Sequence, residues 1–519
     1  MRIADYFDAA AAKHPDNLMI ADIQLGVRLT YAEAQREVHA IAHALTKHFE
    51  GKKSAHIAIY APNDYRVMLL HLAINRADMA WLSVHTRNSM DTNIEVLNYF
   101  DCEFVFFHSA YDDAVPDMKK GLPLAKTYIC MDRKSNHGPA MADWIVDCYQ
   151  PYDAGPEDPH TAMLLQPTGG TTGPSKGGVH THRSYEMVMI SLFETLSITP
   201  DSKHLVISPL THAAGFMAHG FIPIGAANVI LPAFDAEQIL ETMEREKITH
   251  LYLPPTALYA LLAHPKTKST DFSALKFFGI AAAPCAPEKF KEAVQVFGPV
   301  MHDLYGQTEI LFPVLVKYPK DYLRDDGSFD EEIVAATGRA VPFAWMEIMD
   351  DDGNVLPPGE KGEIVVRSTM VMQGYYKRPK ETEEVSKFGW HHTSDIGVKD
   401  KHGFITIVDR KKDMIISGGF NIYPVEVETV ILEHPAVLEC AVIGVPSEKW
   451  GEEIKAVIAL KDGAKANEEE FIKLCKDKLG SVKAPKTVEF WPELPHSAVG
   501  KLLKKDIRAK FWEGQWRAV

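Results

Sequence analysis

The sequence predicts an α/β fold: a large N-terminal domain of parallel-rich sheets layered with helices, a β-rich subdomain, and a small α+β domain at the C-terminus. Three observations lead to this prediction. Apolar runs of strand length alternate with helical patterns up to about residue 304, turn signals separate shorter strands beyond about residue 340, and a charge cluster at 409–413 precedes new strands. A chain of 519 residues is too long for one core, so we expect several domains.

The N-terminal region alternates strands and helices in the way typical of a parallel sheet. Residues 30–33 form a capping box, and apolar residues follow at helical spacing. A strand at 57–60, an apolar helix and a strand at 103–107 come next. Strand, helix and strand in this order indicate right-handed crossovers. The pattern returns after residue 177, with strands expected at 205–207, 229–231, 250–253, 277–280 and 300–304 and a helix at 237–247.

Beyond residue 340 the strands become shorter. Apolar segments at 346–348 and 363–366 are separated by turn signals rich in Asp, Gly and Pro. This spacing predicts a small β-rich subdomain.

The charged run at 409–413 is either a solvated turn or a domain linker. The linker is favoured because the chain after Met414 restarts with strands of its own at 441–443 and 456–459 and a helix at 468–478. The predicted domains are therefore 1–411 and 412–519.

Composition narrows the partners and the compartment. The net charge of −15 argues against nucleic acid or an anionic membrane as a partner. Six cysteines without a CxxC pair indicate reduced thiols, and the N-terminus lacks the apolar core of a signal peptide. The longest apolar stretch, 220–234, is interrupted by prolines and shorter than a membrane span. We expect a cytoplasmic protein without a transmembrane segment, and a homodimer remains open.

The glycine-rich run at 168–177 is suited to holding phosphate. Its glycines leave backbone N–H groups unshielded, its threonines add hydroxyls, and Lys176 adds a positive charge. It is not a Walker A loop, because Ser175 precedes the lysine and Gly177 follows it. A flexible surface loop is the alternative. The apolar run at 162–166 favours the phosphate loop, since such loops follow buried strands.

Further motifs follow this loop. Together with it they resemble the acyl-adenylate-forming superfamily, which includes acyl-CoA synthetases, firefly-type luciferases and peptide-synthetase adenylation domains. The resemblance covers nearly the whole chain, and the C-terminal motifs are most similar to those of fatty-acid and aryl-acid CoA ligases. In chain order the motifs are Pro209–Gly215, Tyr305–Glu309, Thr393–Gly397, Asp409–Asp413 with Ser417–Pro424, and Gly500–Lys501.

The resemblance implies how the triphosphate of ATP is held. Thr308 meets the α-phosphate, and Glu309 binds Mg²⁺. A carboxylate suits this hard cation, because Mg²⁺ prefers oxygen ligands. The alternative for Glu309 is a surface charge at the end of a strand. The residues implied to hold the β- and γ-phosphates are Thr168, Gly169, Gly170, Thr171, Thr172, Gly173 and Lys176.

The resemblance also implies the adenosine contacts. Tyr305 stacks on adenine, with Gly306 beside it in the nucleotide site; a core tyrosine is the alternative. Asp395 accepts hydrogen bonds from both ribose hydroxyls, with Arg410 nearby, unless the two form only a structural ion pair. The backbone implied to read the edge of adenine belongs to Ala282, Ala283 and Pro284.

Catalysis and domain movement are assigned by the same resemblance. Lys501 neutralises charge as the carboxylate attacks the α-phosphorus, although without the family it is one lysine of a Lys-rich tail. His212 gates the passage between acyl pocket and pantetheine tunnel, unless it is simply a buried histidine. The small domain rotates about Lys412. This rotation removes Lys501 from the active site and brings Gly418 and Gly419 next to pantetheine. The residues implied to be catalytic are Lys501, His212, Glu309 and Thr308.

The function implied is that of an ATP-dependent carboxylic acid–CoA ligase that uses ATP, Mg²⁺ and coenzyme A. The residues expected around the acyl group are apolar, which favours a hydrophobic monocarboxylic acid, fatty or aromatic. A stand-alone adenylation enzyme that charges a carrier protein is the alternative, but no carboxylate near His212 could hold an α-amine. A non-catalytic nucleotide-binding protein would be expected to lack Glu309 or Lys501. The expected acyl-pocket residues are Phe216, Met217, Phe221, Ile280, Leu311 and Phe312.

Three departures from the family pattern concern the phosphates and the ribose. Gly169 stands where a serine is usual, and Ser175 separates Pro174 from Lys176, so phosphate binding is expected to be weaker or differently arranged. Ser394 stands where a glycine usually precedes the ribose-binding aspartate.

Overall fold

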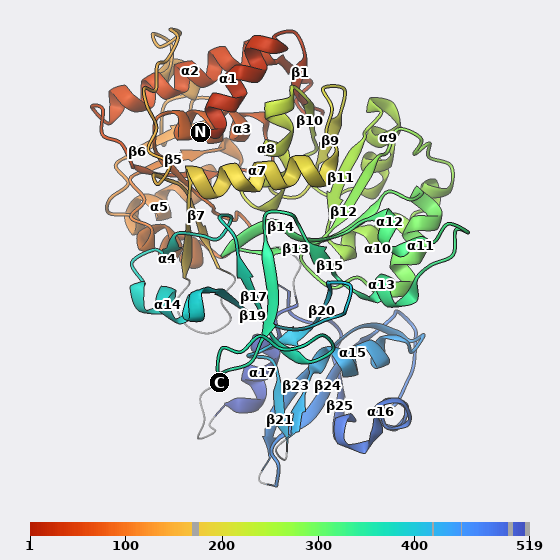
Figure 1. The fold of residues 1–519 in the computed structure, drawn as a ribbon. Coiled ribbons are helices and arrows are strands. Elements are labelled where there is room, and N and C mark those ends of the chain that lie inside the picture. The colour runs from red at the N-terminus through yellow and green to blue at the C-terminus, as the bar shows by residue number, and fades with distance from the viewer. Residues whose placement is uncertain (169–175, 418–419, 448, 497–501, 514–519) are drawn as a thin grey trace. The chain divides into compact units, whose positions relative to one another are not determined.

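The structure is a computed structural model that describes residues 1–168, 176–417, 420–447, 449–496 and 502–513 (Figure 1). The chain forms two compact units. The first consists of Met1–Gly169, Ser175–Trp345 and Arg367–Glu384, and the second mainly of Met346–Val366 and Val385–Val519. The predicted division after residue 411 stays a prediction.

One sheet of the first unit contains the strand that precedes the glycine-rich run. Its strand order is β18-β8-β7-β4-β3-β5-β6, and β7 to β6 run parallel, as predicted for this region. Only β8 and β18 are antiparallel to their neighbours in this order. The bounds are β3 (His56–Tyr60), β4 (Ala80–Leu82), β5 (Phe104–Phe107), β6 (Thr127–Cys130), β7 (Ala162–Pro167), β8 (Gly177–Thr181) and β18 (Gly374–Tyr375).

A second run of strands in the first unit has the order β15-β14-β13-β12-β11-β9-β10-β1-β2. The neighbours in the segment β13-β12-β11-β9-β10-β1 of this run are parallel. At one end β2 is antiparallel to β1, and at the other β13 turns back into antiparallel β14. The bounds are β1 (Leu18–Asp22), β2 (Val27–Thr30), β9 (Lys203–Val206), β10 (Ala227–Ile230), β11 (His250–Leu253), β12 (Phe277–Ile280), β13 (Met301–Gln307), β14 (Ile310–Lys317) and β15 (Gly338–Ala340).

Amphipathic helices cover these sheets. In α9, Ile239, Leu240 and Met243 are buried and pack with Leu251 of β11 in a continuous core. Helix α2 begins with the predicted capping box, in which Thr30 accepts a hydrogen bond from the Glu33 amide. The helices of this unit are α1 (Ile3–Lys13), α2 (Tyr31–His48), α3 (Tyr65–Arg76), α4 (Met90–Tyr99), α5 (Val115–Gly121), α6 (Met141–Trp144), α7 (His182–Leu196), α8 (Ala213–Phe221), α9 (Ala236–Glu246), α10 (Pro255–Ala263), α11 (Pro287–Phe297), α12 (Pro319–Tyr322), α13 (Glu331–Ala335) and α14 (Pro379–Glu384).

The second unit contains the β-rich segment and the predicted α+β portion. The strand run β16-β17-β19-β20 includes antiparallel pairs of long strands, and a separate sheet has the order β22-β21-β24-β23 with β25 on β24. Phe471 and Ile458 belong to the core of that sheet. The bounds are β16 (Trp345–Met349), β17 (Lys361–Arg367), β19 (His391–Lys399), β20 (Phe404–Arg410), β21 (Ile415–Ser417), β22 (Phe420–Ile422), β23 (Val437–Ser447), β24 (Gly451–Leu460), β25 (Thr487–Phe490), α15 (Pro424–Leu432), α16 (Glu468–Lys483) and α17 (Lys504–Trp512).

The α/β class is confirmed, while some predicted bounds are short. The strands expected at 441–443 and 456–459 are the middles of much longer strands, β23 and β24. The helix expected at 468–478 continues to Lys483 beyond a kink at Gly480. Within the described part of the chain, no helix is both long enough and apolar enough to cross a bilayer.

Candidate active site

The two ends of the glycine-rich run are held together. The backbone amide of Thr168, just after β7, donates to the carbonyl of Lys176, just before β8, at 2.8 Å. The ammonium of Lys176 lies over the ring of Tyr375, 5.1 Å from its centre. Of the residues predicted to hold phosphate, Thr168 and Lys176 are therefore anchored at the ends of adjacent strands. Gly169, Gly170, Thr171, Thr172 and Gly173 lie outside the described residues.

Thr308 and Glu309 form the turn between β13 and β14. The carbonyl of Thr308 accepts a hydrogen bond from His180 Nε2 at 2.8 Å, and the carbonyl of Glu309 accepts one from the Met372 amide at 2.8 Å. The Glu309 carboxylate accepts a hydrogen bond from the Tyr375 hydroxyl, 2.7 Å from Oε1. Thus one side chain, Tyr375, contacts both the predicted metal ligand and the predicted phosphate-binding lysine.

The residues expected around adenine lie at the ends of neighbouring strands. Tyr305 and Gly306 are half-buried in β13, and a side chain at Gly306 would come within 2.6 Å of the Phe312 backbone, so only glycine fits without a shift. Ala282 to Pro284 are exposed just after β12, the strand next to β13. Ala282 has a left-handed φ of 77°, unusual for a residue with a side chain. The roles of these residues in adenine binding stay predictions.

His212 occupies the N-cap position of α8 and is half-buried. Its amide donates to the carbonyl of Pro209 at 3.0 Å, and its carbonyl accepts from the Gly215 amide at 2.9 Å. A side chain at Gly215 would clash with the Leu210 carbonyl at 2.1 Å, which explains the glycine in this motif. The gating role of His212 stays a prediction.

The apolar residues expected near the acyl group are buried, and the structure adds a polar cluster that the sequence did not indicate. The Tyr185 hydroxyl lies 2.6 Å from His219 Nδ1, and His219 Nε2 lies 3.3 Å from His71 Nδ1. Burial lowers the pKa of His219 to about 3 and that of His71 well below its ordinary value, so both rings are neutral near pH 7. The buried apolar residues are Phe216, Met217, Phe221, Ile280, Leu311 and Phe312.

Asp395 and Arg410 face each other across β19 and β20 in the second unit. Arg410 Nε lies 3.3 Å from Asp395 Oδ1. Asp395 is buried, and its backbone amide donates a hydrogen bond to Thr393 Oγ1 at 3.1 Å. The ion pair that sequence reasoning left as an alternative is therefore present. Ribose binding by Asp395 stays a prediction. Ser394 has a left-handed φ of 60°, which gives a physical reason for the glycine usual at that position.

The predicted hinge follows directly on β20. Lys412 is exposed, and its carbonyl accepts a hydrogen bond from Arg508 Nη1 of α17 at 3.4 Å. Asp409, three residues earlier, is buried and accepts hydrogen bonds from the amides of Val425 and Arg410. Burial raises the pKa of Asp409 to about 6. Gly418, Gly419 and Lys501 lie outside the described residues, so their predicted roles stay predictions.

A family model described as "AMP-binding enzyme" matches residues 7–376, and the model of the AMP-binding enzyme C-terminal domain matches residues 426–501. The chain belongs to the AMP-binding enzyme family. This confirms the resemblance to adenylate-forming enzymes, and the two matched segments lie in the order that the sequence motifs predicted.

Relatives in the AMP-binding family include named CoA ligases. The medium/long-chain-fatty-acid–CoA ligase FadD8 of Mycobacterium tuberculosis is 38% identical over 378 residues, a match that spans 71% of this chain and 65% of that protein. Feruloyl-CoA synthase of an Amycolatopsis species is 31% identical over 94% of both chains. The predicted class, an AMP-forming acyl-CoA synthetase, agrees with both.

Solved structures of the family share the fold over the whole chain. The amide bond synthetase McbA from Marinactinospora thermotolerans superposes with a TM-score of 0.87 at 28% identity, covering 98% of this chain and 100% of that one. A protein named as an amide bond synthetase therefore has the same fold as this chain.

The chemistry of Glu309 fits a magnesium ion of the kind that family members use with ATP. Among the described residues, no three His, Cys, Asp or Glu side chains gather closely enough to hold a metal by themselves. Mg²⁺ usually takes one or two carboxylates and fills its other positions with phosphate oxygens and water. Glu309, with Oε1 on Tyr375, offers such a single carboxylate beside the predicted phosphate loop.

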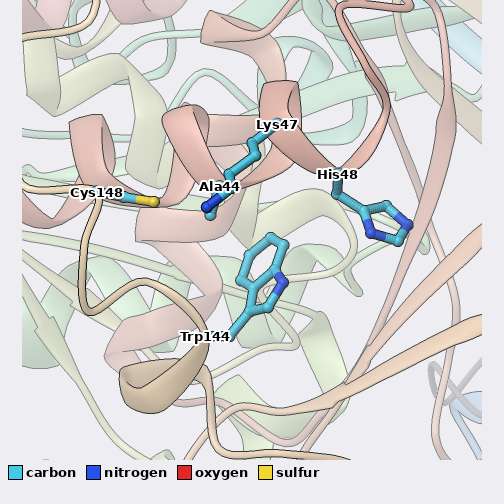
Figure 2. Close-up of a pocket in the computed structure, with 5 residues that line it drawn as sticks. All are labelled: Ala44, Lys47, His48, Trp144 and Cys148. Atoms are coloured by element: carbon cyan, nitrogen blue, oxygen red, sulfur yellow. The ribbon is translucent and has the colours of Figure 1, made fainter.

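A cavity of about 310 Å³ lies elsewhere in the first unit (Figure 2). The indole of Trp144 and the imidazole of His48 face the space beneath α2 in the close-up. None of the residues predicted to bind ATP or CoA lines it. Its lining residues are Ala44, Lys47, His48, Trp144 and Cys148.

Proposed function

We propose that this protein joins a carboxylic acid to coenzyme A at the expense of ATP, in two steps. In the first, the acid's carboxylate attacks the α-phosphorus of ATP, and pyrophosphate leaves with the electrons of the broken P–O bond. In the second, the CoA sulfur attacks the acyl carbon, the thiol loses its proton, and AMP leaves. The observation that carries this proposal is the arrangement of Lys176 and Glu309 around one tyrosine in a member of the AMP-binding family.

The first step brings two anions together, so the residues of the site have to offset negative charge. Lys176 brings a cation to the start of β8, where the glycine-rich run ends. Glu309 would hold Mg²⁺, and the ion would supply positive charge against the negative charge that develops on pyrophosphate. Thr308 lies next to Glu309 in the same turn, which places a hydroxyl beside the α-phosphate in this proposal. Lys501 is the cation we assign to the attacking carboxylate.

The second unit supplies the proposed ribose and hinge residues. Asp395 carries its carboxylate on the paired strands β19 and β20, and the two oxygens of a carboxylate suit two vicinal hydroxyls. Lys412 follows immediately on that strand pair, so a rotation about its backbone would leave Asp395 in place while it moves the residues beyond. Gly418 and Gly419 would then approach pantetheine.

The substrate we propose is a hydrophobic monocarboxylic acid, fatty or aromatic. Phe216, Met217 and Leu311 are buried and apolar, and the nearby histidines His71 and His219 are held neutral by burial. None of these five side chains carries a charge that would compensate a second carboxylate or an ammonium. The named relatives act on fatty acids in one case and on an aromatic acid in another, which supports the same class.

Amide formation is the second candidate, because an amide bond synthetase shares the fold across the whole chain. Both candidates form an acyl-adenylate first and differ in the nucleophile that follows. Carrier-protein charging differs in the same way. The two-step assay therefore measures pyrophosphate release with a panel of acids, and then compares CoA, free amines and a phosphopantetheine-bearing carrier as acceptors. We expect pyrophosphate release with hydrophobic acids and product with CoA. Product with an amine alone would support the second candidate.

A further inference from the structure

Residues 371–376 connect the predicted metal ligand to the predicted phosphate loop. On one side, β18 pairs with β8, with Gly374 opposite Val179 and Tyr375 opposite Gly178. On the other side, the Met372 amide donates to the Glu309 carbonyl at 2.8 Å. This short segment therefore holds the turn of Glu309 and the start of β8, next to Lys176, at a fixed spacing.

The backbone of the Glu309 turn is fixed on both sides of the residue. His180, which is buried in β8, donates to the Thr308 carbonyl, and Met372 donates to the Glu309 carbonyl. The freedom that remains is rotation of the Glu309 side chain. Tyr375 restricts that rotation, because its hydroxyl donates to Oε1 at 2.7 Å. Within the part of the chain that the structure describes, Oε2 of Glu309 takes no hydrogen bond.

Tyr375 itself is firmly placed. The residue is 8% exposed, and its backbone amide donates to Thr382 Oγ1 at 2.9 Å. The Lys176 ammonium lies over the face of the ring, with Nζ 5.1 Å from the ring centre, which is within the range of a cation–π interaction. The ring and the hydroxyl thus act on two different charged groups, one positive and one negative.

We propose that Tyr375 is a positioning residue for the metal and the phosphates: its hydroxyl turns Glu309 so that Oε2 meets Mg²⁺, and its ring holds Lys176 at the phosphate loop. This inference rests on the proposed function, since it assigns Glu309 and Lys176 to bound MgATP. The hydrogen bond to Oε1 fixes the orientation of the Glu309 carboxylate and favours metal binding through Oε2. Such monodentate binding suits the small octahedral Mg²⁺ ion, which keeps phosphate and water as its remaining ligands.

The test separates the hydroxyl from the ring by two substitutions. Tyr375→Phe removes the hydroxyl and keeps the ring, whereas Tyr375→Leu removes both. Tyr376→Phe is the matched control, because this neighbouring tyrosine donates to Asp101 Oδ2 at 2.7 Å instead. Thermal unfolding of each variant establishes that it is folded.

The readout is binding rather than turnover. Mn²⁺ affinity is measured by electron paramagnetic resonance in the presence of a non-hydrolysable ATP analogue, and affinity for the metal-free analogue is measured by calorimetry in EDTA. Loss of a hydrogen bond to a metal ligand typically weakens metal binding about 10- to 100-fold. We expect Tyr375→Phe to weaken Mn²⁺ binding by at least about tenfold, with unchanged metal-free affinity. Tyr375→Leu should weaken both, and Tyr376→Phe neither.

A double-mutant cycle with Glu309→Gln makes the result specific. If the tyrosine acts through the carboxylate, Tyr375→Phe should have no further effect on Mn²⁺ affinity in the Glu309→Gln background. Wild-type Mn²⁺ affinity in Tyr375→Phe, or an equal loss in both backgrounds, would overturn the inference. Failure of the wild-type protein to bind the ATP analogue at all would instead count against the proposed function.

Discussion

The Lys504 ammonium lies 2.7 Å from the Glu428 carboxylate, and this largely buried ion pair joins α17 to α15 in the second unit. Burial opposes the charge on Lys504, but Glu428 and the nearby Asp409 outweigh it and raise the pKa of the lysine. Glu428 also accepts a hydrogen bond from the Val442 amide at 2.7 Å. The pair therefore connects two helices and a strand close to the predicted hinge.

Removing one partner of this pair should destabilise the second unit. Lys504→Met leaves the Glu428 carboxylate buried without its cation, a change that typically costs about 3–5 kcal/mol. Urea unfolding should show this loss, and the double variant Lys504→Met with Glu428→Gln should recover part of it. Lys505→Met, at the exposed neighbouring position, is the control and should change stability little. Equal stability of Lys504→Met and Lys505→Met would refute a structural role for the pair.

Asp409 predicts a pH dependence of stability. Because burial raises its folded pKa to about 6 from the ordinary 3.8, the folded state keeps a proton that the unfolded state releases between these values. The contribution of Asp409 to the free energy of unfolding is therefore largest below about pH 4 and is lost as the pH rises through about 6. Relative to Asp409→Asn, the wild-type protein should lose up to about 3 kcal/mol between pH 4 and pH 7, at 1.36 kcal/mol per pKa unit. Unfolding of both proteins across this range checks the sign, and a constant difference would contradict it.

Gly306→Ala should disturb the turn that carries Glu309. The new methyl group would lie 2.6 Å from the Phe312 backbone, so β13 and β14 would have to separate. Overpacking of this kind typically costs about 1–3 kcal/mol, and ATP affinity should fall with it. Gly220→Ala serves as a control, since its methyl would meet the side chain of Leu192 at 3.0 Å and ask for only a small shift. Calorimetric titration with ATP measures the effect; similar affinities for the two variants would show that Gly306 is not constrained by Phe312.

Substrate choice should follow charge. An ammonium or a second carboxylate would have to lose its water among Phe216, Met217 and Leu311 without a partner, at a cost of several kcal/mol. The kcat/KM for a medium-chain fatty acid or a benzoate-type acid should therefore exceed that for its ω-carboxylated or α-amino analogue by about a thousandfold or more. Comparable values would reveal a buried charged partner in the acyl site.

The local parts of the site could be predicted from sequence. The strand before residue 168, the strand before the Tyr305–Glu309 motif and the pairing of Asp395 with Arg410 are local patterns or motifs, and the structure has them. The support around them could not be predicted. Tyr375 is 66 residues from Glu309, and His180 is 128 residues from Thr308. Such contacts depend on which strands become neighbours in the sheet. The spacing of apolar residues along the sequence predicts strands and helices but not which strands are adjacent.

Ser394 shows the opposite situation. The sequence marks it as a departure from the family pattern but gives no reason why glycine is usual there. Its φ of 60° supplies the reason, because the left-handed conformation costs a residue with a side chain about 1 kcal/mol or more. The histidine cluster of His71 and His219 was missed for another reason: single histidines in apolar helices carry no pattern that distinguishes a buried pair from separate core residues.

The central claim is that one protein forms an acyl-adenylate and then passes the acyl group to CoA. A pulse–chase measurement by mass spectrometry tests it most directly: the enzyme is incubated with ATP, Mg²⁺ and a hydrophobic acid without CoA, and CoA is then added. The account predicts that acyl-AMP and pyrophosphate form first, and that acyl-CoA and AMP replace the adenylate after the chase. Formation of ADP and phosphate, or an acyl-AMP that CoA does not consume, would contradict it.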